Sequence, residues 1–182
     1  MGACKKDSSS NSSNAITGNW KFISVSAVTQ AIVQTSDGVS AYKTITNSAY
    51  TSTNNSGTVT IANNTITANG IAYNITDTAY ASDYQDNVLI DTFSQVLIFN
   101  FPASNSVSNY KLINSDSVYF TGQGIFSAPG VTGSTPAGAR LALNGNILTM
   151  TSSVVKDSTF VNGGYPASNH ETANVVSTLQ RQ

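Results

Sequence analysis

Short runs of alternating apolar and polar residues, broken by turn-forming pairs, recur along almost the whole chain. Residues 58–61 and 65–68 alternate with a period of two, and residues 20–33 are rich in side chains that favour strands. No segment of ten or more residues shows clear helical periodicity, and the best short-helix candidate is residues 78–86. The pattern predicts an all-β protein of about nine or ten antiparallel strands, the last of them over residues 171–180.

Pairs of turn-forming residues mark the expected hairpins, because Asn, Asp and Gly tolerate the positive φ of tight turns. These pairs are Asp37-Gly38, Asn69-Gly70 and Asn144-Gly145. The most apolar segment, residues 88–101, is expected to end at Pro102, since proline lacks the N–H that pairs strands. Strands joined in this way favour an antiparallel up-and-down β-barrel, with a two-sheet β-sandwich as the alternative.

The composition excludes several classes of function. Charged residues make up only 9% of the chain and the formal net charge is -1, so we expect no nucleic-acid partner. No stretch approaches the roughly 20 apolar residues that cross a bilayer as a helix. The single cysteine, Cys4, excludes an internal disulfide framework and a multi-cysteine zinc site.

The residues around Cys4 resemble the start of a bacterial lipoprotein. Cys4 follows Gly2-Ala3 and precedes Lys5-Lys6-Asp7, which is similar to the end of a signal peptide whose cysteine becomes lipidated. The resemblance implies a Gram-negative outer-membrane lipoprotein that faces the periplasm or the cell surface and contacts the membrane only through its lipid. Residues 8–14 contain only Ser and Asn, as in a flexible linker, so we interpret residues 1–16 as anchor and tether. The alternative is a free thiol in a disordered tail.

The motif Gly18-Asn19-Trp20 opens the first long strand and resembles the Gly-x-Trp signature of lipocalins. The whole pattern is also similar to the lipocalin-like domains of small bacterial lipoproteins. The resemblance implies a lipocalin-like barrel over residues 17–182, in which Trp20 closes the base and stacks against Arg181 near the end of the last strand. Such a cation–π contact would be worth roughly 0.5–2 kcal/mol. The alternative is a core tryptophan without an arginine partner.

Aromatic side chains offer a way to bind a ligand inside such a barrel. We expect Ser and Thr hydroxyls to fix the polar end of a small hydrophobic ligand while aromatic rings line an apolar cavity. The candidate lining residues are Tyr73, Phe93, Phe99, Tyr119 and Phe126. The alternative is that the aromatic side chains fill the interior completely.

Groups suited to catalysis are scarce, so we expect no enzyme, no cofactor and no metal. His170 is the only histidine, and beside Glu171 it is interpreted as an exposed histidine next to a solvated acid. Asp83, Asp86 and Asp91 lack the spacing of a calcium loop and are interpreted as surface carboxylates. No nucleophile elbow, phosphate-binding loop or zinc-protease motif is present in the sequence.

Functions of different classes remain open at this point. The leading hypothesis is a lipid-anchored envelope protein that binds a small apolar or amphipathic ligand in a barrel cavity without catalysis. The alternative is a surface carbohydrate-binding or adhesion β-sandwich that contacts its partner through loops. A small inhibitor or an assembly component of an envelope complex is a third possibility. The sequence makes no prediction about oligomeric state.

Overall fold

The computed structural model describes residues 15–121 and 138–182, and nearly all of these residues lie in β-strands. The strands are β1 (Gly18–Ser36), β2 (Ala41–Thr51), β3 (Thr53–Ala62), β4 (Thr65–Gln85), β5 (Val88–Asn114), β6 (Ser117–Phe120), β7 (Gly138–Asn144), β8 (Ile147–Asn162) and β9 (Tyr165–Arg181). No helix within the described ranges is long and apolar enough to span a membrane. The predicted all-β fold class is therefore confirmed.

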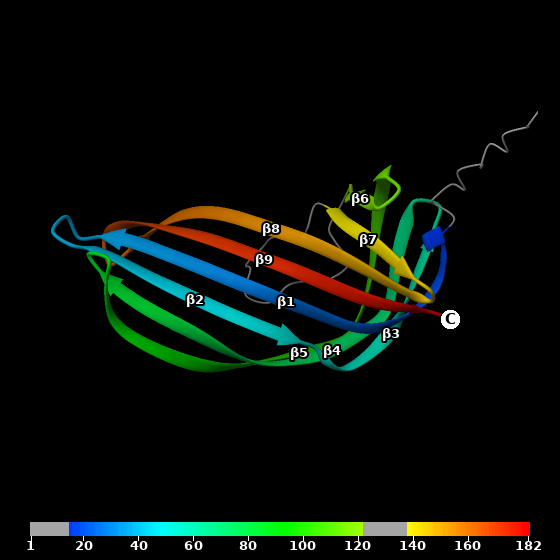
Figure 1. Ribbon diagram of the computed structural model, residues 1–182, viewed down its shortest axis with the longest axis horizontal. Coiled ribbons are helices and arrows are strands. Elements are labelled where there is room, and N and C mark those ends of the chain that lie inside the picture. The colour runs from blue at the N-terminus through cyan, green and yellow to red at the C-terminus, as the bar shows by residue number, and fades with distance from the viewer. Residues whose placement is uncertain (1–14, 122–137) are drawn as a thin grey trace, which may run out of the picture.

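The strands form one antiparallel sheet whose hydrogen bonds run in a ring, so the molecule is barrel-like (Figure 1). The ring closes because β1 pairs with β9 over most of its length, from Trp20 opposite Arg181 to Thr35 opposite Ala167. β2 and β3 follow one another along β4, and both also pair with β1.

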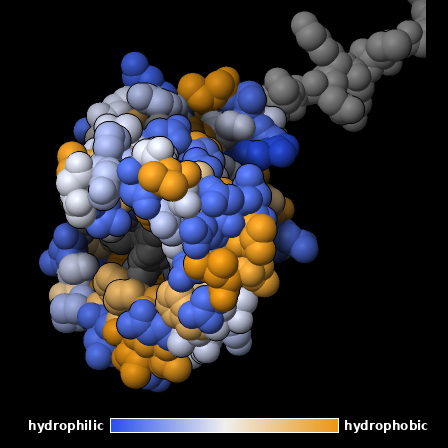
Figure 2. Space-filling view, turned by 90° about the vertical axis from the view of Figure 1, so that its left-hand side faces the viewer, coloured by the Kyte–Doolittle hydropathy of each residue, from blue (hydrophilic) through white to orange (hydrophobic). Residues whose placement is uncertain are grey.

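The ring is uneven along its length. At one end, here called the base, β6 and β7 connect β5 to β8 and complete the circumference. At the other end, here called the tip, β5 continues beside β4 and β8 continues beside β9, with no described strand between them. The turns that join β1 to β2, β4 to β5 and β8 to β9 lie at the tip (Figure 1). Figure 2 looks onto this end and shows a hollow whose rim carries both hydrophobic and hydrophilic residues.

The hydrophobic core fills the base. Its largest fully buried side chains are Trp20, Phe22, Val25, Val59, Ile61, Ile66, Ile75, Leu148 and Leu179. In β1 a register shift between Phe22 and Ser24 moves the inward-facing positions from even to odd numbers, so Val25 follows Phe22 into the core. A bulge thus lets one long strand follow the curvature of the barrel while it keeps its apolar side chains inside.

The hairpin predicted at Asn69-Gly70 is wrong. β4 runs through this pair, and register shifts against both neighbouring strands make it a bulge. The turn between β3 and β4 is formed by Asn63 and Asn64, which have φ values of 51° and 61°. Gly70 has a φ of 61°, so the conformational freedom that indicated a turn serves the bulge instead.

The other two predicted hairpins are confirmed. Gly38, with a φ of 86°, lies in the turn between β1 and β2. The turn between β7 and β8 is formed by Gly145 and Asn146, one residue later than the predicted pair.

One predicted element type and two predicted strand boundaries are wrong. Residues 78–86 form no helix, because they are the last part of β4 and the start of the turn at Asp86 and Asn87. Pro102 does not end a strand, since it lies inside β5 at a register shift against β4, where a missing N–H is tolerated. β9 begins at Tyr165 rather than at residue 171, directly after the turn at Gly163 and Gly164.

Candidate functional site at the tip

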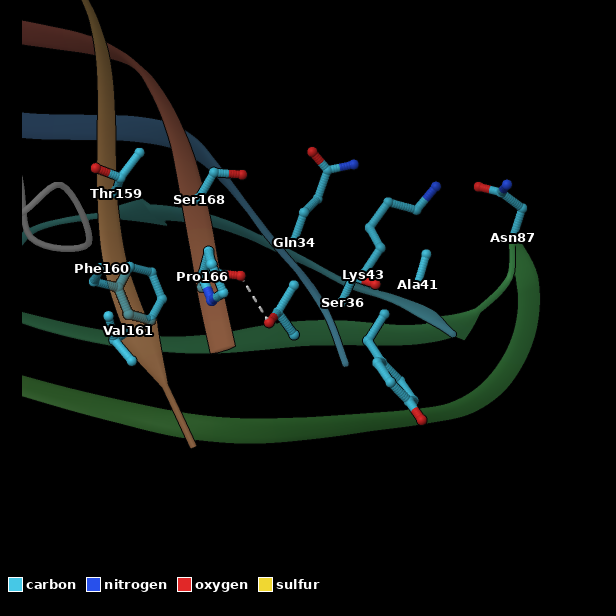
Figure 3. A pocket seen from close by; sticks show the side chains of 13 residues that line it. Gln34, Ser36, Ala41, Lys43, Asn87, Thr159, Phe160, Val161, Pro166 and Ser168 are labelled. Atoms are coloured by element: carbon cyan, nitrogen blue, oxygen red, sulfur yellow. Dashed lines mark hydrogen bonds between the residues drawn. The ribbon is translucent and has the colours of Figure 1, made fainter. Parts of the chain in front are cut away.

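A pocket of about 710 Å³, here called the tip pocket, lies where four strands approach their turns. Figure 3 shows it from close by. It is lined by Gln34, Thr35, Ser36, Ala41, Tyr42, Lys43, Asn87, Thr159, Phe160, Val161, Pro166, Ala167 and Ser168. This volume lies within the range of roughly 300–1,000 Å³ that is usual for small-molecule sites.

Strand pairing brings these residues together from distant parts of the sequence. Phe160 pairs with Ala167, Ala167 with Thr35, and Thr35 with Tyr42, so the four form one row across β8, β9, β1 and β2. Thr35 has the same odd parity as Val25 and Ala27, the core residues of β1 after the bulge, so the row faces inward. Residues of the neighbouring row, which faces outward, also line the pocket, and the pocket therefore wraps around the end of the sheet.

Apolar surface and a single cation meet in the tip pocket. Phe160 is 43% exposed and Val161 is 71% exposed, so both leave apolar surface uncovered. Lys43 is the only charged residue among the described residues of the lining, and its Nζ lies 4.7 Å from the centre of the Tyr84 ring. The lining thus combines apolar surface on both faces of the end of β8 with one positive charge on β2.

Hydrogen bonds order the rim of the pocket. The Thr35 hydroxyl donates to the Pro166 carbonyl at 3.1 Å and ties β1 to β9 (Figure 3). The Tyr42 hydroxyl donates to Asp37 at 3.2 Å. The negative charge of Asp37 raises the pKa of Tyr42, while backbone N–H groups of Ser40 and Val39 lower the pKa of Asp37. Near neutral pH, Tyr42 is therefore protonated and Asp37 ionised.

At the base, the structure brings Trp20 and Arg181 together. The guanidinium carbon of Arg181 lies 4.5 Å from the centre of the Trp20 ring, and the indole itself is fully buried. The indole N–H donates to the Ile16 carbonyl at 2.9 Å. Arg181 also donates to the carbonyls of Thr17 and Ala15. The pair therefore fastens the start of the described chain to its end.

The structure does not bring the predicted ligand-lining aromatic residues together as one site. Tyr73 is buried and its ring stacks on Phe101 at 4.5 Å, while Phe99 packs partly buried against the core. Phe93 is half exposed near the tip. Tyr119 lies between the buried Val118 and Phe120 and faces outward, so its predicted place inside the barrel is wrong. Cys4 and Phe126 lie outside the described residues.

Small apolar and polar residues rather than aromatic ones occupy the buried inward-facing positions nearer the tip among the described residues. Asp77, Ser152 and Thr29 are buried there, together with Glu171. The prediction of a solvated Glu171 is therefore wrong, because only 5% of this residue is exposed and it accepts a hydrogen bond of 2.7 Å from Asn169. Glu171 is buried because it lies inside β9 on the inner face. The sequence alone predicts Glu171 at the start of the last strand, where a side chain would be solvated.

The remaining candidate groups lie apart from the tip pocket. His170 is partly exposed, as expected, and its Nδ1 lies 2.7 Å from Asp157. Asp83 accepts a hydrogen bond from Thr44, and Asp86 caps the backbone N–H of Ala41. Among the described residues, no group of three or more His, Cys, Asp or Glu could hold a metal ion.

Sequence reasoning missed Tyr42 and Phe160, the two aromatic residues of the tip pocket. Each lies near a turn with an exposed apolar neighbour, but the pairing of their strands joins positions far apart in the chain. The only sequence signal for these two residues is the turn-forming pairs, which mark strand ends that can lie beside one another.

No protein-family model matches the chain, and a comparison with curated proteins found no match.

Proposed function

We propose that this protein binds a small amphipathic molecule in the tip pocket and performs no catalysis. The observation that carries the proposal is the joint presence of the exposed Phe160 side chain and the single cation Lys43 in one pocket of about 710 Å³. Apolar surface would hold the hydrophobic part of the ligand, and Lys43 would hold an acidic or polar head. The buried polar residues on the inner face favour the tip over the interior as the place of binding.

Titration of the full chain with dodecanoate, followed by calorimetry and native mass spectrometry, tests this function. We expect one saturable site. Phe160→Ala should weaken binding about tenfold, since an aromatic anchor contributes much of the energy of a small site. Lys43→Gln should weaken binding of dodecanoate and leave binding of its methyl ester unchanged. The matched control is Tyr119→Ala, because Tyr119 is an aromatic residue of similar exposure away from the pocket.

Two results would contradict the proposal. One is the absence of saturable binding for both probes. The other is binding that Phe160→Ala and Tyr119→Ala reduce equally, because this would place the ligand elsewhere or make it adventitious.

The lipid anchor at Cys4 forms a second part of the proposal and rests on the resemblance of residues 2–7 to a lipoprotein signal. A diacylated or triacylated cysteine would hold the protein stably at the outer membrane of a Gram-negative cell. The chain expressed behind a lipoprotein signal peptide should incorporate labelled palmitate and sediment with outer membranes. Cys4→Ser should remove both properties, with dodecanoate binding by the purified domain unchanged. Retention of the label in Cys4→Ser would refute the anchor.

A further inference from the structure

A second groove opens in the wall of the barrel, far along β4 from the tip turns. β2 pairs with β4 only as far as Asn47 opposite Tyr80, and β3 takes over at Thr53 opposite Asn74. Between these pairs, residues 48–52 and 75–79 do not pair with each other. A groove of about 620 Å³, here called the wall groove, lies at this interruption.

Asp77 lies in this interruption with an incomplete set of hydrogen bonds. It is 9% exposed and lines the wall groove. Its Oδ1 accepts the backbone N–H of Thr78 at 2.8 Å, whereas its Oδ2 is buried and has no hydrogen-bond partner among the described residues. An unsatisfied buried carboxylate oxygen is costly, so a donor supplied by a bound molecule would stabilise this arrangement.

The rest of the groove is rich in neutral hydrogen-bonding groups. Gln30 donates to Asn47 at 2.9 Å, and the hydroxyls of Thr29 and Ser48 are 3.2 Å apart, so these side chains are held in place across β1 and β2. Within the described part of the chain, Asp77 is the only charged residue that lines the groove. The groove therefore disfavours anions and offers donors and acceptors to a neutral polar molecule.

An aromatic ring stands beside these polar groups. Tyr80 lines the wall groove, belongs to the outward-facing positions of β4, and is 64% exposed. Val28, which is 63% exposed, adds apolar surface on β1. An apolar surface next to amides and hydroxyls, with a carboxylate on the inner side of the gap, suits a ring that has one hydrophobic face and a rim of hydroxyl groups.

We infer that the wall groove is a binding site for a neutral saccharide, which stacks on Tyr80 at the outer face and donates a hydroxyl hydrogen bond to Asp77 through the gap between residues 48–52 and 75–79. The site is distinct from the tip pocket, since the two share no lining residue. It requires neither the amphipathic ligand nor the lipid anchor.

Saturation-transfer NMR and calorimetry on the full chain, with a panel of neutral mono- and disaccharides, test the inference. Glucuronic acid serves as the anionic comparison and putrescine as the amine comparison. We expect at least one neutral saccharide to bind saturably, with affinity about tenfold lower in Tyr80→Ala and in Asp77→Asn. Tyr84→Ala is the matched control, because Tyr84 lies four residues further along β4 at the same parity and outside the groove.

Each outcome decides the inference. Weakened saccharide binding in Tyr80→Ala and Asp77→Asn, with Tyr84→Ala unchanged, supports it. Binding of putrescine alone, binding of no sugar, or equal loss in Tyr84→Ala overturns it. Circular dichroism of each variant excludes unfolding as the cause of weaker binding. If Asp77→Asn fails to fold, Tyr80→Phe takes its place in the comparison. It keeps the ring, so it should retain the binding that Tyr80→Ala weakens.

Discussion

Trp20 shows how one side chain can join the two ends of a chain. Its ring is enclosed by the core on one side and by the Arg181 guanidinium on the other, and its N–H is satisfied by the Ile16 carbonyl. Burial of the whole indole, together with the arginine contact, makes this residue a major source of stability at the base.

Trp20→Ala should lower the free energy of unfolding by about 3–5 kcal/mol, because it leaves a large cavity in the core. Urea denaturation of the full chain measures this loss. Tyr119→Ala is the control, since its side chain faces outward and its removal opens no cavity. An unchanged unfolding midpoint in Trp20→Ala would show that the indole does not support the base.

At the scale of the strand, bulges decide which residues reach the core. Gly57 in β3 and Gly70 in β4 face one another at such a place, and both have positive φ values, of 110° and 61°. A Cβ built on Gly57 would lie 2.7 Å from the Gly70 carbonyl oxygen, whereas a Cβ on Gly70 meets nothing within 4 Å. Gly57 is therefore needed both for its positive φ and for its close contact with β4, whereas Gly70 is needed for its positive φ alone.

Gly57→Ala should cost about 3 kcal/mol of stability, because it combines backbone strain with a collision against backbone atoms. Gly70→Ala should cost only about 1–2 kcal/mol, since it meets strain alone. Thermal unfolding of both variants gives the comparison. Equal losses would mean that β3 moves away from β4 without a penalty.

The same strands show what could be predicted from the sequence and what could not. Alternation in residues 58–61 and 65–68 correctly indicated β3 and β4, because a half-buried strand needs a period of two. Asn69-Gly70 was misinterpreted as a turn, because turns and bulges both need positive φ and only the pairing partner distinguishes them. The tip pocket and the wall groove depend on strand registers, which no local pattern encodes.

At the scale of the whole molecule, the uneven ring leaves sheet margins that pair with no other described strand. Along the tip half of β5, one edge lacks a described partner, and six large hydrophobic side chains there are 50–67% exposed. They are Val88, Leu89, Ile90, Phe93, Val96 and Ile98. Asp91 is the only charged residue among positions 88–101. Closure therefore protects the base, whereas at the tip a long apolar edge without a partner among the described strands favours association between copies.

Ile98→Lys should slow aggregation on heating while it leaves the unfolding midpoint unchanged, because it places a charge on the free edge and outside the core. Light scattering during a temperature ramp measures the effect. Val28→Lys is the control, since Val28 is similarly exposed in a strand that has neighbours on both sides. Equal slowing by both variants would indicate a general effect of charge rather than protection of the edge.

The ends of the described chain meet at the base, where the Gln182 N–H donates to the Asn19 carbonyl at 3.0 Å. Figure 1 shows this pole opposite the three tip turns. A short peptide could therefore join the first and last described residues, and new ends could be cut at a tip turn, with little loss of loop-closure entropy. A fluorophore or an immobilising tag attached beside Ala15 or Gln182 would sit at the same pole and leave the far side of the protein accessible.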